Sequence, residues 1–174
     1  PPPPSASPLP PPPTPPPPSS PSPNANLQST DPPCFPSSAT VQLADGETVP
    51  LSSLSAGDSI LAAAADGTLG FDAASSFSLA DPSAKAAFFL SLTTATATVT
   101  LTPTHKLPAG PAKALKQASE VAVGETMWLA SPAVGTLVQE PILGIASVMA
   151  DGLHSPLTKH GGWPVVDGVA TSYN

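Results

Sequence analysis

Residues 101–107 read Leu-Thr-Pro-Thr-His-Lys-Leu, and they lie in the middle of the part of the chain that is poor in proline. The residues before them, 96–101, alternate between polar and apolar side chains in the pattern of a β-strand. His105 therefore follows a predicted strand after a short connection. Imidazole titrates near neutral pH, so histidine is a residue type that can exchange a proton with a reacting group.

The same strand pattern continues on both sides of residues 101–107. Short runs rich in β-branched and aromatic residues recur, and they end in turn sequences such as Asp45-Gly46 and Asp66-Gly67. Turns come about every ten residues, which is typical of all-β domains. The sequence predicts one all-β domain, with strands near residues 39–43, 49–51, 59–62, 88–92, 96–101, 126–129, 134–138, 142–148 and 165–166. The alanine-rich residues 112–121 predict a single short helix.

The N-terminal part has a different composition. Fifteen of the first 23 residues are proline, which lacks a backbone N–H and fixes φ, so this part can build neither a helix nor a sheet ladder. We expect an extended, disordered polyproline linker or stalk over residues 1–33, followed by the folded domain at 34–174. In composition the stalk resembles the hydroxyproline-rich wall glycoproteins of green algae and plants. That resemblance implies a secreted, extracellular or cell-wall location.

Charge and cysteine content exclude several classes of function. The net charge is −7 with only five Lys and Arg, which leaves no basic stripe for nucleic acid. No apolar run approaches the roughly 20 residues that span a bilayer. One cysteine forms no internal disulfide and no cysteine-based metal cluster, and His105, His154 and His160 lack the spacing of zinc ligands. We expect a monomer that uses neither a metal nor an organic cofactor.

Five short motifs follow one another in the folded part. Their order is Cys34-Phe35-Pro36, then Leu54-Ser55-Ala56-Gly57-Asp58, residues 101–107, Ser155-Pro156-Leu157-Thr158 and finally residues 165–173 (VVDGVATSY). This set resembles the autoprocessing domains of hedgehog proteins and their relatives, which belong to the Hint (hedgehog/intein) superfamily and begin with Cys-Phe. The resemblance implies a horseshoe-like β fold of two pseudo-symmetric halves and self-cleavage on the N-terminal side of Cys34.

The chemistry of such a cleavage can be argued from the residues themselves. A deprotonated thiol is a good nucleophile, and Cys34 can attack the carbonyl of Pro33, the residue directly before it, by closing a small ring. The intermediate collapses to a thioester once the amine of Cys34 is protonated. The resemblance implies that His105 supplies this proton and that Thr102 binds the scissile amide or orients the imidazole. The substrate is then the chain's own N-terminal segment.

The second step departs from the hedgehog pattern. Hedgehog proteins use a sterol as the second nucleophile, with an aspartate to activate it and a sterol-recognition extension. The aspartate position falls on Leu79, Asp81 is the possible substitute two residues away, and the sequence ends at Asn174. We therefore expect water, or an unidentified small nucleophile, to resolve the thioester. Splicing of the intein type is not expected, because inteins end with a His-Asn pair and Tyr173 stands before Asn174 in place of that histidine. Ser172 replaces the late cysteine of hedgehog proteins, which leaves Cys34 as the only thiol.

An alternative hypothesis gives the domain no chemistry. In this alternative an inert β domain carries a proline-rich stalk for interaction or for the cell wall. The remaining polar residues fit either hypothesis. Asp58 and the pair Asp167-Gly168 are interpreted as turn residues, and His154 and His160 as loop residues without a catalytic role.

Overall fold

The computed structural model describes residues 2–16 and 33–172, and its folded part is built almost entirely of β-strands. This confirms the predicted all-β class. The strands are β1 (Thr40–Gln42), β2 (Thr48–Pro50), β3 (Ser59–Ala63), β4 (Leu69–Asp81), β5 (Ala87–Thr93), β6 (Thr98–Leu101), β7 (Lys106–Ala109), β8 (Ala114–Gln117), β9 (Thr126–Ser131), β10 (Thr136–Pro141), β11 (Gly144–Ala150), β12 (Leu153–Thr158), β13 (Trp163–Val166) and β14 (Val169–Ala170), with 3-10 helices η2 (Leu51–Ser53) and η3 (Ala118–Glu120).

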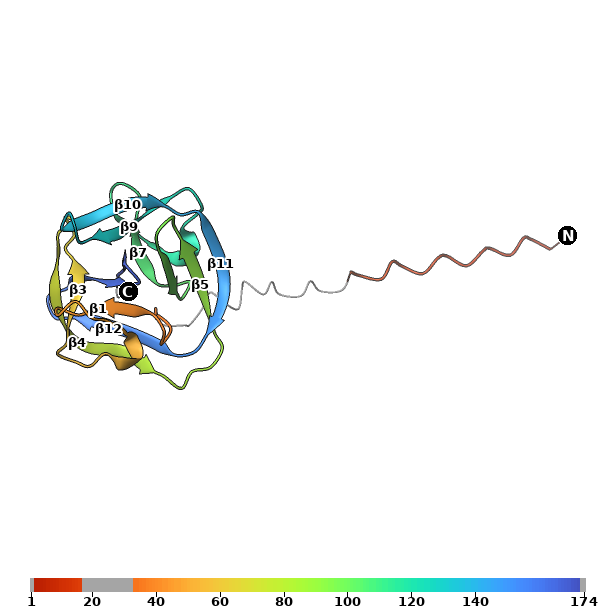
Figure 1. Ribbon diagram of the computed structural model, residues 1–174. Coiled ribbons are helices and arrows are strands. Elements are labelled where there is room, and N and C mark those ends of the chain that lie inside the picture. Colours follow the sequence, from red (N-terminus) through yellow and green to blue (C-terminus); the bar gives the residue numbers. More distant parts are fainter. Residues whose placement is uncertain (1, 17–32, 173–174) are drawn as a thin grey trace.

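The strands form three sheets. The largest has the order β12-β4-β3-β13-β14-β9-β7-β8, with β10 also paired to β9. The second has the order β11-β5-β6, and the third is the hairpin of β1 and β2. The large sheet curls, so that β4, β10 and β12 run around the outside of the domain together with β11 of the three-stranded sheet, while β14 lies inside (Figure 1). The last described residues, Thr171 and Ser172, are accordingly buried.

One apolar cluster joins the three sheets. It includes Val41 from the hairpin, Leu92 and Val99 from the three-stranded sheet, and Leu107 and Val169 from the large sheet, each at most 1% exposed. Burying a side chain of this size stabilises the fold by roughly 1.5–3 kcal/mol. The cluster therefore fixes the segments that carry the motifs at residues 34–36 and 101–107.

Two expectations about local structure were wrong. Residues 112–121 form the strand β8 and the short η3 rather than an α-helix. Gly110 and Lys113 have positive φ angles of 71° and 54° and make a hairpin turn, after which the backbone of β8 pairs with β7. A segment this short gains little stability from intrahelical hydrogen bonds alone. Its pairing with a neighbouring strand therefore decides its conformation. His154 lies inside β12 and is 3% exposed, not in a loop, whereas His160 does follow β12 in a turn.

The predicted turn residues are confirmed. The carboxylate of Asp58 accepts a hydrogen bond from the Ser55 amide at 2.9 Å. Asp167 and Gly168 have φ angles of 53° and 82° in the turn that joins β13 to β14. The side chain of Asp167 also reaches across the sheets, where it accepts hydrogen bonds from the Thr40 amide (2.9 Å) and hydroxyl (3.0 Å).

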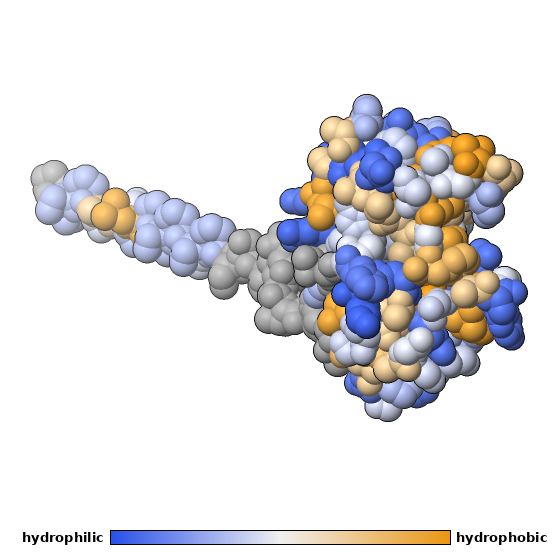
Figure 2. All heavy atoms as spheres, turned by 90° about the vertical axis from the view of Figure 1, so that its left-hand side faces the viewer, coloured by the Kyte–Doolittle hydropathy of each residue, from blue (hydrophilic) through white to orange (hydrophobic). Residues whose placement is uncertain are grey.

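On the face drawn in Figure 2, apolar and polar residues are interspersed, and neither kind dominates the surface. Residues 2–16 are exposed throughout and contain neither helix nor strand. The rest of the expected stalk, residues 17–32, lies outside the described residues. Within the described part of the chain, no helix has the length and apolar character needed to cross a membrane.

The contact between Asp167 and Thr40 gives a first prediction. We expect Asp167→Ala to lower the free energy of unfolding by about 1–3 kcal/mol, because the Thr40 amide loses its acceptor and alanine tolerates positive φ poorly. Asp167→Asn keeps an acceptor oxygen and is better suited to positive φ, so its loss should be clearly smaller. Urea unfolding at pH 7 measures both variants, and equal losses would show that this hydrogen bond contributes nothing.

Candidate active site

The sole cysteine is held by its backbone. Cys34 is completely buried, and its amide donates a hydrogen bond to Thr102 Oγ1 at 2.9 Å. In return the Thr102 amide donates to the Cys34 carbonyl, also at 2.9 Å. Thr102 directly follows β6, whose position is fixed by the apolar cluster. The amide that Thr102 binds is the nitrogen of the Pro33–Cys34 peptide bond, which is the predicted scissile bond.

His105 lies beside this pair. Its amide donates to the Thr102 carbonyl at 3.0 Å, so residues 102–105 form a tight turn. The imidazole is completely buried, and its ring centroid lies 4.3 Å from that of Phe35. Ring atom Nε2 is hydrogen-bonded to the Ser172 carbonyl. Ser172 is itself held by two hydrogen bonds to the Lys106 carbonyl, one from its amide (2.9 Å) and one from its hydroxyl (2.8 Å).

This environment sets the charge and the tautomer of His105. Burial lowers the pKa of His105 to about 4, while the Ser172 carbonyl and the Cys34 backbone oppose part of that shift. The imidazole is therefore neutral at pH 7. Because a carbonyl oxygen only accepts hydrogen bonds, Nε2 carries the proton and Nδ1 carries the lone pair. Nδ1 has no hydrogen-bond partner among residues 2–16 and 33–172, which leaves it able to accept a proton.

The structure brings together most, but not all, of the residues predicted for the site. Cys34, Thr102 and His105 are in contact, and Pro33 precedes Cys34 at a half-buried position. Asp81 does not join them. Its carboxylate accepts hydrogen bonds from the Ser83 hydroxyl at 2.6 Å and the Ser83 amide at 3.0 Å, and these bonds lower its pKa.

Sequence analysis missed two partners of the site. The Ser172 carbonyl orients His105, and Ser37 is hydrogen-bonded to His154 on the strand next to Phe35. No local pattern could have found them, because the contacts of Ser172 and Ser37 span 67 and 117 positions. The motif at residues 165–173, the last of the five in order along the chain, was the one sequence signal that the C-terminal segment contributes to the site.

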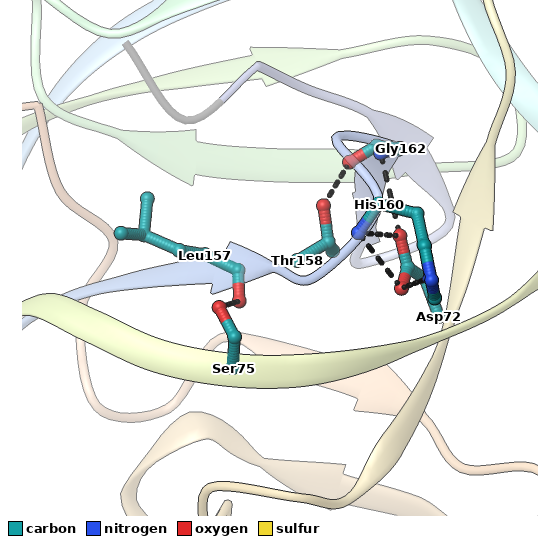
Figure 3. Close-up of polar contacts among 6 residues, drawn as sticks. All are labelled: Asp72, Ser75, Leu157, Thr158, His160 and Gly162. Atoms are coloured by element: carbon teal, nitrogen blue, oxygen red, sulfur yellow. Dashed lines mark hydrogen bonds and ion pairs between the residues drawn. The ribbon is translucent and has the colours of Figure 1, made fainter.

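A second polar cluster lies away from Cys34, around the turn between β12 and β13 (Figure 3). The buried carboxylate of Asp72 accepts hydrogen bonds from the His160 ring (2.9 Å), the His160 amide (3.0 Å) and the Gly162 amide (3.4 Å). Burial by itself would raise the pKa of Asp72, but these hydrogen bonds lower it below its ordinary value. Thr158 closes the turn by donating to the Gly162 carbonyl. This cluster holds the turn that leads into β13.

Comparisons with known proteins agree with the all-β fold. The family model of the Hint module matches residues 21–173, so the chain belongs to the Hint family. Among solved structures, the DnaB intein from Synechocystis sp. PCC 6803 has a TM-score of 0.69 at 14% identity, over 80% of this chain and 97% of that one. The TvoVMA intein has a TM-score of 0.65 at 16% identity (82% and 98%). An intein-like domain from Clostridium thermocellum has 0.63 at 14% (81% and 98%).

No curated protein matches the chain. The identities to the solved structures are low, so those structures establish the Hint/intein fold. Membership of the Hint family supports self-cleavage of the autoprocessing or splicing type in general terms. The hedgehog-like subclass and the algal origin stay predictions.

The reciprocal bonds between Cys34 and Thr102 give a second prediction. In a Cys34→Ala background, Thr102→Val should lower the free energy of unfolding by about 1–3 kcal/mol, because the amide of residue 34 is left buried without an acceptor. Thr102→Ser keeps the hydroxyl and should lose clearly less. Chemical unfolding monitored by tryptophan fluorescence compares the two variants. Similar losses would mean that the hydroxyl is not the stabilising group.

The buried imidazole gives a third prediction, on stability against pH. An unfolded histidine has a pKa near 6.5 and folded His105 one of about 4, so the unfolded state binds more protons between these values. The stability contributed by neutral His105 is complete above pH 6.5 and falls by about 3 kcal/mol as pH drops to 4. His105→Gln should flatten this part of the curve; His154, whose pKa is also lowered by burial, leaves a remainder. An unchanged slope would contradict the burial effect.

Proposed function

We propose that this chain cleaves itself between Pro33 and Cys34 by an N-to-S acyl shift, with Cys34 as nucleophile and Thr102 and His105 as its partners. The observation that carries the proposal is the hydrogen bond from the Cys34 amide to Thr102 Oγ1 inside a Hint fold. It puts the nitrogen of one particular peptide bond beside a buried, neutral histidine.

The first half of the step uses His105 as a base. Nδ1 takes the thiol proton of Cys34 as the sulfur attacks the carbonyl carbon of Pro33, and a five-membered ring closes. Thr102 Oγ1 accepts from the N–H of Cys34 throughout, which holds the peptide plane in a fixed orientation. The Phe35 ring against His105 limits the rotation of the imidazole.

The second half uses the same histidine as an acid. Burial disfavours the imidazolium, as the lowered pKa of His105 indicates. The imidazolium therefore returns its proton readily, and the receiving atom is the nitrogen of Cys34. The C–N bond breaks, which leaves Pro33 as a thioester on the sulfur and a free amine on Cys34. Atoms and charges balance without a metal or an organic cofactor.

The fate of the thioester is also part of the proposal. Water hydrolyses it, or an acceptor nucleophile takes the acyl group, and either route releases the proline-rich segment. Asp81 was the sequence-based candidate for assisting this step, and one oxygen of its carboxylate, Oδ1, accepts both hydrogen bonds from Ser83. Tyr173 and Asn174, which bear on the splicing alternative, lie outside the described residues. A secreted or cell-wall setting fits the proline-rich segment and stays part of the proposal.

The fourth prediction tests cleavage directly. The full chain should break before Cys34 during incubation at neutral pH, and dithiothreitol should accelerate the break because an external thiol resolves the thioester. Denaturing gels follow the reaction, and mass spectrometry of the released peptide identifies the group on Pro33. A free carboxylate means that water was the acceptor, and added mass means an adduct.

Two variants are the controls for that experiment. Cys34→Ala should abolish cleavage under both conditions. His105→Gln should fold but cleave at least about 100-fold more slowly than the parent, because a general acid–base group usually contributes at least that much to the rate. If the parental chain stays intact with and without thiol, the acyl shift is refuted and the domain is an inert carrier of the stalk. Parental cleavage by His105→Gln would assign the proton transfers to another group.

A further inference from the structure

The two residues at the end of the described chain are held by matching pairs of hydrogen bonds. The amide and the hydroxyl of Thr171 both donate to the Pro164 carbonyl, at 3.0 and 2.8 Å. The amide and the hydroxyl of Ser172 both donate to the Lys106 carbonyl, at 2.9 and 2.8 Å. Thr171 and Ser172 are 0% and 3% exposed, and we call their four hydrogen bonds the C-terminal clamp. The acyl shift proposed above gives neither hydroxyl a role.

The C-terminal clamp joins the end of the described chain to two strands that are far apart in the sequence. Pro164 belongs to β13, and Lys106 is the first residue of β7. Because the amide and the hydroxyl of one residue share an acceptor, the two bonds fix both its backbone and its side-chain rotamer. Thr171 and Ser172 are consecutive, so the peptide group between them is held from both sides. The direction of the Ser172 carbonyl is therefore set by the whole clamp rather than by one bond.

The carbonyl of Ser172 meets the imidazole of His105, the proposed proton carrier. His105 Nε2 is hydrogen-bonded to this carbonyl, while Ser172 donates to Lys106, the residue directly after His105. Ser172 thus contacts two consecutive residues, one through its carbonyl and the other through its amide and hydroxyl. Its carbonyl cannot turn away from the imidazole without straining the bonds to Lys106. The Phe35 ring, 4.3 Å away between centroids, packs against the same imidazole.

The contact between Ser172 and His105 decides which ring nitrogen carries the proton. A buried N–H that loses its acceptor is destabilised by its full desolvation cost, so the Ser172 carbonyl favours the proton on Nε2. A displaced carbonyl removes that preference, and the proton then also occupies Nδ1. A molecule with the proton on Nδ1 has no lone pair there to receive the thiol proton of Cys34. The hydroxyls of the C-terminal clamp therefore act on the reaction only through His105.

We propose that Thr171 and Ser172 are positioning residues, whose hydroxyls hold the Ser172 carbonyl against His105 and thereby keep the Nδ1 lone pair available. The effect on the rate of cleavage rests on the proposed acyl shift, because His105 must be its base. The effect on the tautomer of His105 does not depend on cleavage and can be measured in an uncleaved chain. The tautomer and the rate therefore give two separate tests.

The first test measures the tautomer of His105 in the full chain. Cys34→Ala keeps the chain intact, and the nitrogen-15 chemical shifts of the imidazole distinguish a protonated ring nitrogen from an unprotonated one. His105→Gln identifies the signals of His105 among those of the three histidines. Ser172→Ala and Thr171→Val should each move part of the population to the Nδ1-protonated form. Thr171→Ser keeps the hydroxyl and should retain the parental shifts.

The second test measures cleavage in chains that keep Cys34. Dithiothreitol resolves the thioester, so the rate with excess thiol reports the acyl shift. Ser172→Ala and Thr171→Val should each cleave about tenfold more slowly than the parent, which is the rate equivalent of one lost buried hydrogen bond. Thr171→Ser should cleave at close to the parental rate. Two positions are used so that the failure of one variant to fold leaves the other to decide.

Thr158→Val is the matched control. Thr158 is also buried, at 8% exposed, and its hydroxyl donates to the Gly162 carbonyl at 2.7 Å in the turn after β12. This variant should leave the tautomer of His105 and the cleavage rate at their parental values. A parental tautomer in folded Ser172→Ala and Thr171→Val would overturn the proposal even if both cleave slowly, because a merely structural role also slows cleavage. A parent that stays intact with thiol would refute the acyl shift, and the tautomer would still decide the role of the clamp.

Discussion

The reciprocal hydrogen bonding of Cys34 and Thr102 is the constraint on which the rest of the site depends. Both polar backbone groups of Cys34 are used, its N–H by the Thr102 hydroxyl and its C=O by the Thr102 amide. The next residue, Phe35, pairs with β12 in the same way. The first residues of the domain are thereby fixed between two segments that are distant in the sequence. A peptide bond at such a junction has one defined orientation, which is the first requirement for attack by its own side chain.

The second requirement is a proton acceptor that is not already charged, and burial provides it. An exposed histidine would be partly protonated near pH 7, whereas His105 is neutral because desolvation lowers its pKa. The Ser172 carbonyl decides which ring nitrogen keeps the proton. The last described residue, Ser172, therefore orients the imidazole of a histidine in the middle of the chain. The burial of His105 also lowers the stability of the fold at acid pH. The apolar cluster that includes Leu107 and Val169 has to offset this loss of stability.

The class of fold and the residues at the centre of the site were predictable, while their partners were not. Alternating strands and turn sequences are local signals and predicted the all-β class. The order of the five motifs carried the family resemblance that implied roles for Cys34, Thr102 and His105. The helix expected at 112–121 was wrong because strand pairing with β7 overrode a weak local preference. The prediction that His154 lies in a loop was wrong. Its side chain is hydrogen-bonded to Ser37, 117 positions away, and a contact between residues so far apart produces no periodic pattern in the sequence. Asp81 was singled out by its place in the sequence, but only the fold shows that its Oδ1 is hydrogen-bonded to Ser83.

Under the proposed acyl shift, the distribution of these groups along the chain couples cleavage to folding. Cys34 comes from the start of the domain, Thr102 and His105 from its middle, and the Ser172 carbonyl from near its end. The hydrogen bonds that join these three regions span 68 positions (Cys34 to Thr102) and 67 positions (His105 to Ser172), so a half-folded chain does not assemble the complete set. The scissile bond is then an ordinary peptide bond until the C-terminal segment has entered the curled sheet. The Cys34 amide, the Thr102 hydroxyl and the buried His105 imidazole meet within one folded state, so the proposed acyl shift needs no rearrangement of the domain.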